Sequence, residues 1–258
     1  MSSSYILFDF DGTLYAEDAQ YRHYARLLGE ALAPQARPLY ERDLQRVAAG
    51  THPLRPGRGY VHPGFLVRYP GAERGAWDWE GHPVTQLQSD PPVRWVGDPW
   101  WVAPTIALHH GLDPQTQDAV FLQVRRWMMS EAFAIRPVPG LRAVIDELRP
   151  RYRVWLLTNS PEVDSRAILA RLGLEDAFDE LRFRCRKPAG LEQALSELAA
   201  ADRVISVGDN FFNDILPAVL AGREALYVNP EDEIELPPGV HRVSGPREIP
   251  AALATLAR

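Results

Sequence analysis

Lysine and cysteine are nearly absent from this chain of 258 residues. Of its 28 Lys and Arg residues all but Lys187 are arginine, and Cys185 is the only cysteine. A single cysteine excludes an intramolecular disulfide and favours a reducing compartment, so we expect a cytoplasmic protein. The lone lysine raises a question of chemistry, because an ammonium group is a compact point charge while a guanidinium group is a planar fork.

Long apolar runs and basic clusters are also missing. No apolar run reaches the ~20 residues of a membrane span, and residues 1–12 lack the basic start and apolar stretch of a signal peptide. The net charge is −6 and the arginines are spread along the chain, which argues against nucleic acid as a partner. We expect neither a membrane nor a nucleic acid partner, and both a monomer and a homodimer remain compatible with the sequence.

Short apolar runs are present, and they predict a parallel sheet. They are rich in β-branched and aromatic residues and do not alternate with polar ones, which is typical of strands buried on both faces. The runs are 5–8, 154–157, 204–207 and 225–228. Helices are predicted near the later runs, at 141–148, 162–172, 191–198, 213–221 and 247–258. Strands that alternate with helices predict an α/β fold with a Rossmann-like open parallel sheet.

A long insertion separates the first predicted strand from the second. We expect a core of residues 1–15 and 138–258 and a mainly helical cap over 16–137, whose predicted helices span 17–32, 39–49, 104–111 and 115–131. The middle, 51–103, is rich in Trp, Pro and Gly and looks irregular, with short strands at "FLVRY" (65–69) and "VRWVG" (93–97). Its five tryptophans favour a small core or an interface patch over an aromatic wall that stacks a ligand.

Polar side chains follow three of the predicted strands directly. Ligands of open parallel sheets bind outside the carboxyl ends of the strands, so we expect these side chains to share one crevice. They are Asp9 and Asp11 after the first strand, Thr158 and Asn159 after the second, and Asp209 and Asp214 after the third.

The clustered carboxylates predict a cation. Hard oxygen ligands suit Mg²⁺, which binds a few carboxylates and shares a substrate phosphate, whereas the seven histidines are scattered and do not suggest zinc. Lys187 precedes the helix that leads into the third strand, and its ammonium could approach a phosphoryl oxygen there together with the Thr158 hydroxyl. This is the proposed reason for the single lysine.

The ordered motifs resemble those of the haloacid dehalogenase superfamily, most of whose members are phosphatases. They are "DFDGTL" (9–14), "LLTNS" (156–160), "RKP" (186–188) and "GDNFFND" (208–214). The resemblance covers residues 5–15 and roughly 138–230, and the insertion point matches the helical cap type of this superfamily.

The resemblance implies a role for each motif residue. Asp9 would be the nucleophile and Asp11 the general acid and base. Asp9, the backbone carbonyl of Asp11, Asp209 and Asp214 would bind Mg²⁺, while Thr158, Asn159 and Lys187 would hold the phosphoryl group. Each of these side chains has a plainer alternative. Asp9 or Asp11 could be a turn carboxylate, Thr158 or Asp214 could cap a helix, Lys187 could be a surface lysine and Asn159 could be a turn residue. Ser160 is the expected cap of the helix that begins near Pro161.

The expected function is that of a Mg²⁺-dependent phosphatase, which hydrolyses a small phosphate monoester through an aspartyl-phosphate. Asp11 argues against a dehalogenase, which lacks that carboxylate, and the absence of lysine from the cap argues against a phosphonatase, which uses a cap lysine. A phosphotransferase or phosphomutase of the same superfamily is the alternative enzyme. A non-catalytic protein that binds a partner through the Trp-rich insert is the alternative from another class.

Overall fold

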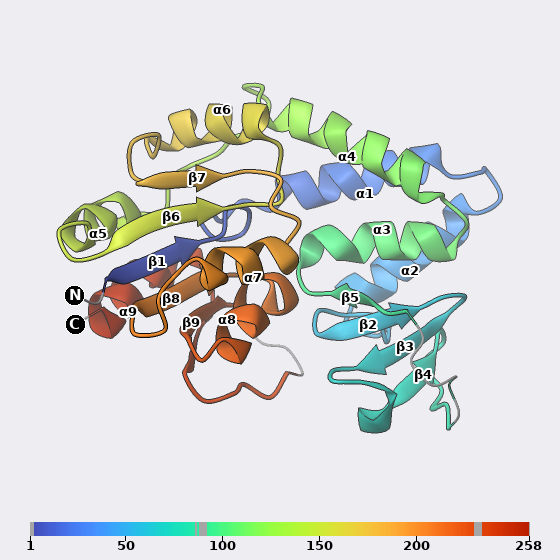
Figure 1. The fold of residues 1–258 in the computed structure, drawn as a ribbon. Helices are drawn as coiled ribbons and strands as arrows, with labels where there is room; N and C mark the ends of the chain where they lie inside the picture. Colours follow the sequence, from blue (N-terminus) through green and yellow to red (C-terminus); the bar gives the residue numbers. More distant parts are fainter. Residues whose placement is uncertain (1–2, 86, 88–91, 230–233, 258) are drawn as a thin grey trace. The chain divides into compact units, whose positions relative to one another are not determined.

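The structure is a computed structural model that describes residues 3–85, 87, 92–229 and 234–257. The chain divides into two compact units (Figure 1). The first comprises residues 1–17, 128–231 and 236–258, and the second comprises residues 18–127 and 232–235. Within the described ranges, no helix combines the length and the apolar content that crossing a bilayer requires.

A six-stranded parallel sheet forms the centre of the first unit, in the order β10-β9-β8-β1-β6-β7 (Figure 1). The strands are β1 Ser4–Phe8, β6 Arg153–Leu157, β7 Glu180–Arg182, β8 Arg203–Gly208, β9 Glu224–Val228 and β10 Val240–Val243. The predicted α/β fold class and its four predicted strands, β1, β6, β8 and β9, are confirmed. The two unpredicted strands, β7 and β10, lie at the edges, where half-exposed positions remove the apolar run that marks a buried strand.

Helices of the first unit follow the predicted spacing. They are α5 Leu141–Leu148, α6 Glu162–Leu172, α7 Ala189–Ser196, α8 Leu216–Leu220 and α9 Ile249–Leu256. The four periodic residues of α5 are all buried, as an amphipathic helix requires. One face of the sheet packs against α7 and α8, where Leu7 and Val204 of the strands meet Leu195 and Ala218 of the helices.

The second unit combines four helices with an antiparallel sheet in the order β4-β3-β2-β5. The helices are α1 Ala19–Ala31, α2 Arg37–Ala48, α3 Pro99–His109 and α4 Pro114–Met128, and the strands are β2 Arg58–Val61, β3 Phe65–Arg68, β4 Ala76–Asp78 and β5 Arg94–Val96. The strands predicted within "FLVRY" and "VRWVG" are confirmed as β3 and β5. The expectation of an otherwise irregular middle is wrong, because β2 and β4 complete a regular sheet around them.

Tryptophans of this segment belong to packed clusters, as the small-core interpretation predicts. Trp95 covers the apolar cluster of Val61, Val67 and Ala76. Trp79 is buried and stacks on His109 with ring centroids 3.8 Å apart. These rings contribute apolar area to the small core of the second unit.

Helix α3 starts five residues before the predicted position, 104. Asp98 is its N-cap, and the Asp98 carboxylate accepts a hydrogen bond from the backbone N–H of Trp100 at 2.8 Å. Pro99 stands in the first turn and Pro104 lies inside the helix. The predicted start at 104 is therefore wrong, because Asp98 and Pro99 already form the beginning of the helix.

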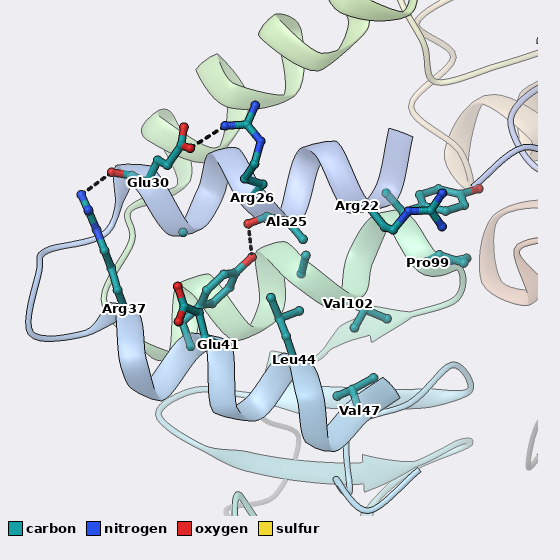
Figure 2. A pocket seen from close by; sticks show the side chains of 14 residues that line it. Arg22, Ala25, Arg26, Glu30, Arg37, Glu41, Leu44, Val47, Pro99 and Val102 are labelled. Atoms are coloured by element: carbon teal, nitrogen blue, oxygen red, sulfur yellow. Dashed lines mark hydrogen bonds and ion pairs between the residues drawn. The ribbon is translucent and has the colours of Figure 1, made fainter. Parts of the chain in front are cut away.

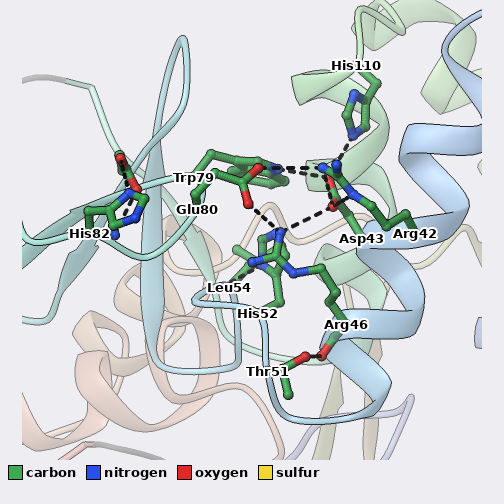
Figure 3. A network of polar contacts seen from close by, with 11 residues as sticks. Arg42, Asp43, Arg46, Thr51, His52, Leu54, Trp79, Glu80, His82 and His110 are labelled. Carbon is green, nitrogen blue, oxygen red and sulfur yellow. Dashed lines mark hydrogen bonds and ion pairs between the residues drawn. The ribbon is translucent and has the colours of Figure 1, made fainter.

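A buried carboxylate ties the parts of the second unit together (Figure 3). Asp43 of α2 is fully buried and accepts hydrogen bonds from Trp79 Nε1 and His110 Nε2, both at 2.9 Å, and from Arg42 Nε at 3.0 Å. Burial opposes ionisation, but the hydrogen bonds from His110, Trp79 and Arg42 outweigh it and hold the pKa of Asp43 well below its usual range. Asp43 therefore remains a charged link between α2, the segment after β4 and the end of α3.

A cavity of about 670 Å³ also lies within the second unit, lined by α1, α2 and α3 (Figure 2). Leu44, Val102 and Ala103 supply apolar lining, while the charged groups of Arg26 and Glu30 pair with each other. The charged groups of Arg26 and Glu30 are thus engaged with each other.

The segment after α4 belongs to the first unit, which corrects the predicted cap boundary at residue 137. Arg171 of α6 donates hydrogen bonds to three backbone carbonyls, that of Met128 at the end of α4 and those of Ser130 and Phe133 in this segment. One guanidinium group offers five N–H donors in a fixed fork, so it can hold several carbonyls at once. Residues 128–137 therefore group with the α/β unit, and the second unit begins at Asp18.

Candidate active site

The carboxyl ends of three neighbouring strands place the predicted residues at one edge of the sheet. Strands β8, β1 and β6 lie side by side, and Phe8 at the end of β1 pairs with Val207 of β8 and Leu156 of β6. The loops that follow carry Asp9 and Asp11 after β1, Thr158 and Asn159 after β6, and Asp209 and Asp214 after β8. This is the edge at which open parallel sheets bind ligands.

Lys187 joins two of these loops. Its Nζ donates to Oδ1 of Asp9 and to Oδ1 of Asp214, both at 2.5 Å. The side chains of Lys187 and Asp214 are each 3% exposed and that of Asp9 is 11% exposed. The single lysine therefore lies between two buried carboxylates and is not a plain surface residue.

Three carboxylates form the cluster that a metal ion would use. Asp9, Asp209 and Asp214 each place one ligand oxygen so that the three atoms lie within 4.8 Å of one another. All three donors are hard oxygens, the type that Mg²⁺ prefers. Their formal charge exceeds that of Lys187 by two, which matches a divalent cation.

The electrostatics of Asp9 point to the same need for a cation. Burial and the charge of Asp214 raise the pKa of Asp9 to about 8, although Lys187 acts in the opposite direction. Burial also works against the Lys187 ammonium, but the charges of Asp214 and Asp9 outweigh it and raise the pKa of Lys187 above its ordinary value. The lysine stays charged, and one ammonium does not fully compensate the carboxylates around it.

Two glycines allow the carboxylates to approach the backbone. Gly12 has φ +76°, and a Cβ there would lie 2.1 Å from Oδ2 of Asp209. A Cβ on Gly208 would lie 2.5 Å from the Asp214 side chain. Because real Cβ atoms do not come so close to other heavy atoms, both positions need glycine in this arrangement.

A tight turn after β8 fixes Asp214. The residues Phe211–Ile215 form a single π-helical turn, in which Asp214 Oδ2 accepts from the backbone N–H of Asn210 at 3.0 Å. Asn210 itself caps the turn, since its Oδ1 accepts from the backbone N–H groups of Phe212 and Asn213, both at 3.1 Å. The cap is thus Asn210 and not Asp214, and the signal for it was an Asn directly before the helical segment.

The loop that carries Lys187 is held by the loop after β6. The backbone N–H of Cys185 donates to the Thr158 carbonyl at 3.0 Å, and that of Arg184 donates to the Ser160 carbonyl at 3.1 Å. Arg184 and Arg186 have φ of 51° and 54°. Positive φ is costly for residues with a Cβ and persists only where surrounding contacts impose it.

Asn159 acts on Lys187 through its side chain. Its Oδ1 accepts from the backbone N–H of Lys187 at 2.6 Å, and its Nδ2 lies 3.5 Å from the Lys187 carbonyl oxygen. The amide of Asn159 is therefore engaged in placing the lysine, and the predicted phosphate contact remains a prediction for its backbone N–H alone. The buried Thr158 hydroxyl accepts from the backbone N–H of Ser160 at 3.0 Å, which still allows it to donate its own proton to a ligand.

Asp11 is contacted by two hydroxyl groups that the sequence did not assign to the site. Ser160 Oγ donates to Asp11 Oδ2 at 2.6 Å, and the Tyr15 hydroxyl donates to Asp11 Oδ1. Helix α6 has Pro161 as its N-cap residue, without a side-chain cap bond. The expected helix-capping role of Ser160 is therefore wrong, because its hydroxyl faces Asp11 instead.

Comparison with known proteins gives one family match and one curated relative. The family model of haloacid dehalogenase-like hydrolases matches residues 4–222 of the chain. Glyceraldehyde 3-phosphate phosphatase of Methanothermobacter thermautotrophicus is 31% identical over 105 residues, which are 38% of this chain and 46% of that enzyme. The chain thus matches about half the length of this relative.

Solved structures resemble the chain over nearly its whole length. A Bacillus subtilis protein described as the HAD hydrolase YfnB bound to magnesium has a TM-score of 0.53 at 15% identity, covering 98% of this chain and 99% of its own. A haloacid dehalogenase-like family protein of Streptococcus pneumoniae has a TM-score of 0.52 at 14% identity, covering 100% and 99%. A Thermotoga maritima protein described as a β-phosphoglucomutase has a TM-score of 0.51 at 17% identity, covering 98% and 99%. At such identities the likeness is one of fold.

Proposed function

This chain belongs to the haloacid dehalogenase-like hydrolases, and from that membership we propose that it is a phosphatase of small phosphate monoesters. The observation that carries the proposal is the Lys187 ammonium, bound to Asp9 and Asp214 beside a third carboxylate, Asp209. The match to a glyceraldehyde 3-phosphate phosphatase over part of the chain supports the same reaction. The near absence of cysteine is the reason for proposing the cytoplasm as its place.

Asp9 would act as the nucleophile, and Asp11 would transfer the protons. A carboxylate oxygen of Asp9 attacks phosphorus, the ester P–O bond breaks, and the leaving oxygen takes a proton from Asp11. A water molecule then attacks phosphorus of the aspartyl-phosphate, Asp11 takes the proton of that water, and the bond between phosphorus and Asp9 breaks. The products are inorganic phosphate and the alcohol, and both carboxylates return to their starting states.

Lys187 and Thr158 would hold the phosphoryl group during transfer. The ammonium of Lys187 neutralises phosphoryl oxygens, and the Thr158 hydroxyl donates to one of them. Asp9, Asp209 and Asp214, with the backbone carbonyl of Asp11, would hold Mg²⁺, which when bound supplies positive charge to the phosphoryl group. The all-oxygen donor set, with its three ligand atoms within 4.8 Å of one another, fits this ion.

Phosphate release from 4-nitrophenyl phosphate tests the proposal. The wild type should release phosphate with Mg²⁺ and not with EDTA, and Asp9→Asn should release none in either condition. Quenching a reaction with the wild type should leave a phosphoryl mass increase on the peptide that contains Asp9. Magnesium-dependent turnover by Asp9→Asn would contradict the assignment of the nucleophile.

Metal binding can be measured without turnover. A ligand that binds only the folded protein stabilises it by about 2.7 kcal/mol at a concentration of 100 times its Kd. Mg²⁺ should therefore raise the melting temperature of the wild type, and the rise should be lost in Asp209→Asn. The matched control is Asp146→Asn, which removes an exposed carboxylate that pairs with Arg142 and should keep the full rise.

A further inference from the structure

Both oxygens of the Asp11 carboxylate accept a hydrogen bond from a hydroxyl group. The Ser160 hydroxyl, 149 positions away in the sequence, reaches Oδ2 at 2.6 Å. The Tyr15 hydroxyl, four positions away, reaches Oδ1. The two donors come from different loops of the same unit and engage the carboxylate on both of its oxygens.

Each hydroxyl is itself held in place. The Tyr15 ring is fully buried and packs edge-on between Phe10, at a centroid distance of 6.0 Å, and Phe133, at 6.2 Å. Phe133 is anchored by the hydrogen bond that Arg171 donates to its carbonyl. A ring packed in this way has its phenol oxygen placed by the core and not by solvent.

Ser160 is fixed through its backbone. Its N–H donates to the Thr158 hydroxyl at 3.0 Å, and its carbonyl accepts from the N–H of Arg184 at 3.1 Å. The side chain is buried as well. Ser160 thus stands between the residue expected to hold phosphate and the residue expected to transfer the proton.

A proton transfer depends on the orientation of the donor group. A carboxyl side chain on a loop can rotate about two torsions, and each rotation moves the acidic proton away from the leaving oxygen. Proton transfer is efficient only when donor and acceptor lie within hydrogen-bond reach. A contact on both oxygens removes this freedom before substrate arrives, which is preorganisation.

We propose that Tyr15 and Ser160 are positioning residues for proton transfer by Asp11, holding its carboxyl group in one orientation from both sides. The inference rests on the proposed function, in which Asp11 gives its proton to the leaving oxygen and then receives one from water. Neither hydroxyl gains or loses a covalent bond in this scheme. Their effect is exerted wholly through Asp11.

The demand for a proton can be varied through the leaving group. In 4-nitrophenyl phosphate the departing oxygen is stable as an anion, whereas in benzyl phosphate it would leave as an alkoxide and needs the proton. The two esters carry rings of similar size, so they probe proton transfer with little change in binding. Tyr15→Phe keeps the packed ring and Ser160→Ala keeps the backbone contacts, so each variant removes only the hydroxyl.

The loss of rate in the two variants should be larger on benzyl phosphate than on 4-nitrophenyl phosphate. General acid catalysis contributes about 10²- to 10⁴-fold. Each variant should therefore lose about 10-fold in kcat/KM, which covers the steps up to release of the alcohol, on benzyl phosphate and less than about 3-fold on 4-nitrophenyl phosphate. The inhibition constant of inorganic phosphate should stay within about 2-fold, since the phosphate contacts are unchanged. Asp11→Asn should show the same selectivity with a larger loss, and Ser160→Thr, which restores a hydroxyl, should recover most of the benzyl phosphate rate.

Matched variants control for the loss of a buried hydroxyl. Tyr152→Phe removes a buried phenol oxygen of the residue directly before β6, at the opposite end of that strand from the site. Ser165→Ala removes a buried hydroxyl of α6. Both should keep the ratio of the two rates seen in the wild type. Equal losses on both esters in Tyr15→Phe and Ser160→Ala, or no loss on either, would overturn the inference while leaving the phosphatase intact. Release from neither ester by the wild type with Mg²⁺ would overturn the proposed function, and this inference with it.

Discussion

The ammonium of Lys187 lies 2.5 Å from Oδ1 of Asp9, although the two residues are 178 positions apart in the sequence. This contact joins the loop after the first strand to the loop before α7. It explains why the chain keeps its only lysine here, because an ammonium can donate to two carboxylates from one point, and its Nζ also reaches Asp214 at 2.5 Å. A planar guanidinium group would need more room and a different geometry.

Replacing Lys187 by arginine should therefore abolish most of the activity. The positive charge is kept, but the fork does not fit between Asp9 and Asp214, so we expect a fall of about 100-fold or more in kcat/KM, comparable to the loss of one preorganised donor. Arg142→Lys, the reverse exchange at an exposed ion pair with Asp146 and Asp176, should keep wild-type kinetics. Wild-type kinetics in Lys187→Arg would mean that compactness of the charge is irrelevant.

Amine labelling can test whether Lys187 is buried and charged. Reductive methylation needs an accessible, uncharged amine, and the Lys187 side chain is 3% exposed with its pKa held above the ordinary value by Asp214 and Asp9, against the effect of burial. Peptide mapping should find residues 182–190 unlabelled in the native protein and labelled in urea. A synthetic peptide of this segment, labelled in both conditions, is the control.

Gly12→Ala should damage both stability and metal binding. The added Cβ would meet Asp209 Oδ2 at 2.1 Å, and φ is +76°; we expect the free energy of unfolding to fall by about 1–3 kcal/mol. Gly173→Ala is the matched control, since it has φ +66° but no neighbouring atom within 4 Å. It should lose about 1 kcal/mol from backbone strain and keep the melting-temperature rise with Mg²⁺, which Gly12→Ala should lose. Urea denaturation measures the loss of stability, and thermal melting with and without Mg²⁺ measures the loss of metal binding.

Asn159→Ala should act through Lys187. The variant removes the acceptor of the Lys187 backbone N–H, which the Asn159 side chain contacts at 2.6 Å, and should cost about 1–2 kcal/mol of unfolding free energy. KM for a phosphate ester should rise because the ammonium is less well placed. Asn159→Asp keeps an acceptor oxygen and should retain more activity than Asn159→Ala, and the reverse order would contradict the positioning role.

The second unit should lose stability in mild acid through His52. Burial lowers the pKa of His52 from 6.5 to about 4, so the folded protein holds this ring neutral while the unfolded chain binds a proton. The stabilisation that the neutral His52 ring gives the folded protein is complete above pH 6.5 and is lost as the pH falls from 6.5 to about 4. The free energy of unfolding should fall over this range by an amount on the order of 3 kcal/mol.

The variant His52→Asn isolates this contribution. The backbone N–H of Leu54 donates to His52 Nδ1 at 2.9 Å, and an amide oxygen can replace that acceptor without titrating. Urea denaturation across this pH range should give a flatter pH dependence for His52→Asn than for the wild type. His241→Asn, at an exposed position of β10, should keep the wild-type slope, and an identical slope in His52→Asn would refute the prediction.

Sequence alone determined the central sheet and the main chemistry. Runs such as "VWLL" and "VISV" are apolar on both faces, which only a covered parallel strand satisfies, and the motif residues follow them directly. Asp9, Asp209 and Asp214 were predicted to meet for this reason. The edge strands β7 and β10 and the cap strands β2 and β4 were missed, because charged residues or glycine interrupt the apolar pattern within segments of only three or four residues.

Tertiary structure decided which side chains serve the motif residues. The Ser160 hydroxyl donates to Asp11 instead of capping α6. The Asn159 side chain accepts from the backbone N–H of Lys187. The Tyr15 hydroxyl donates to Asp11, and its ring packs against Phe133. Each of these contacts depends on the direction of a side chain relative to a partner far away in the sequence. Local propensity places a residue in a strand, helix or loop, but only the packed unit sets which of its several possible hydrogen-bond partners it meets.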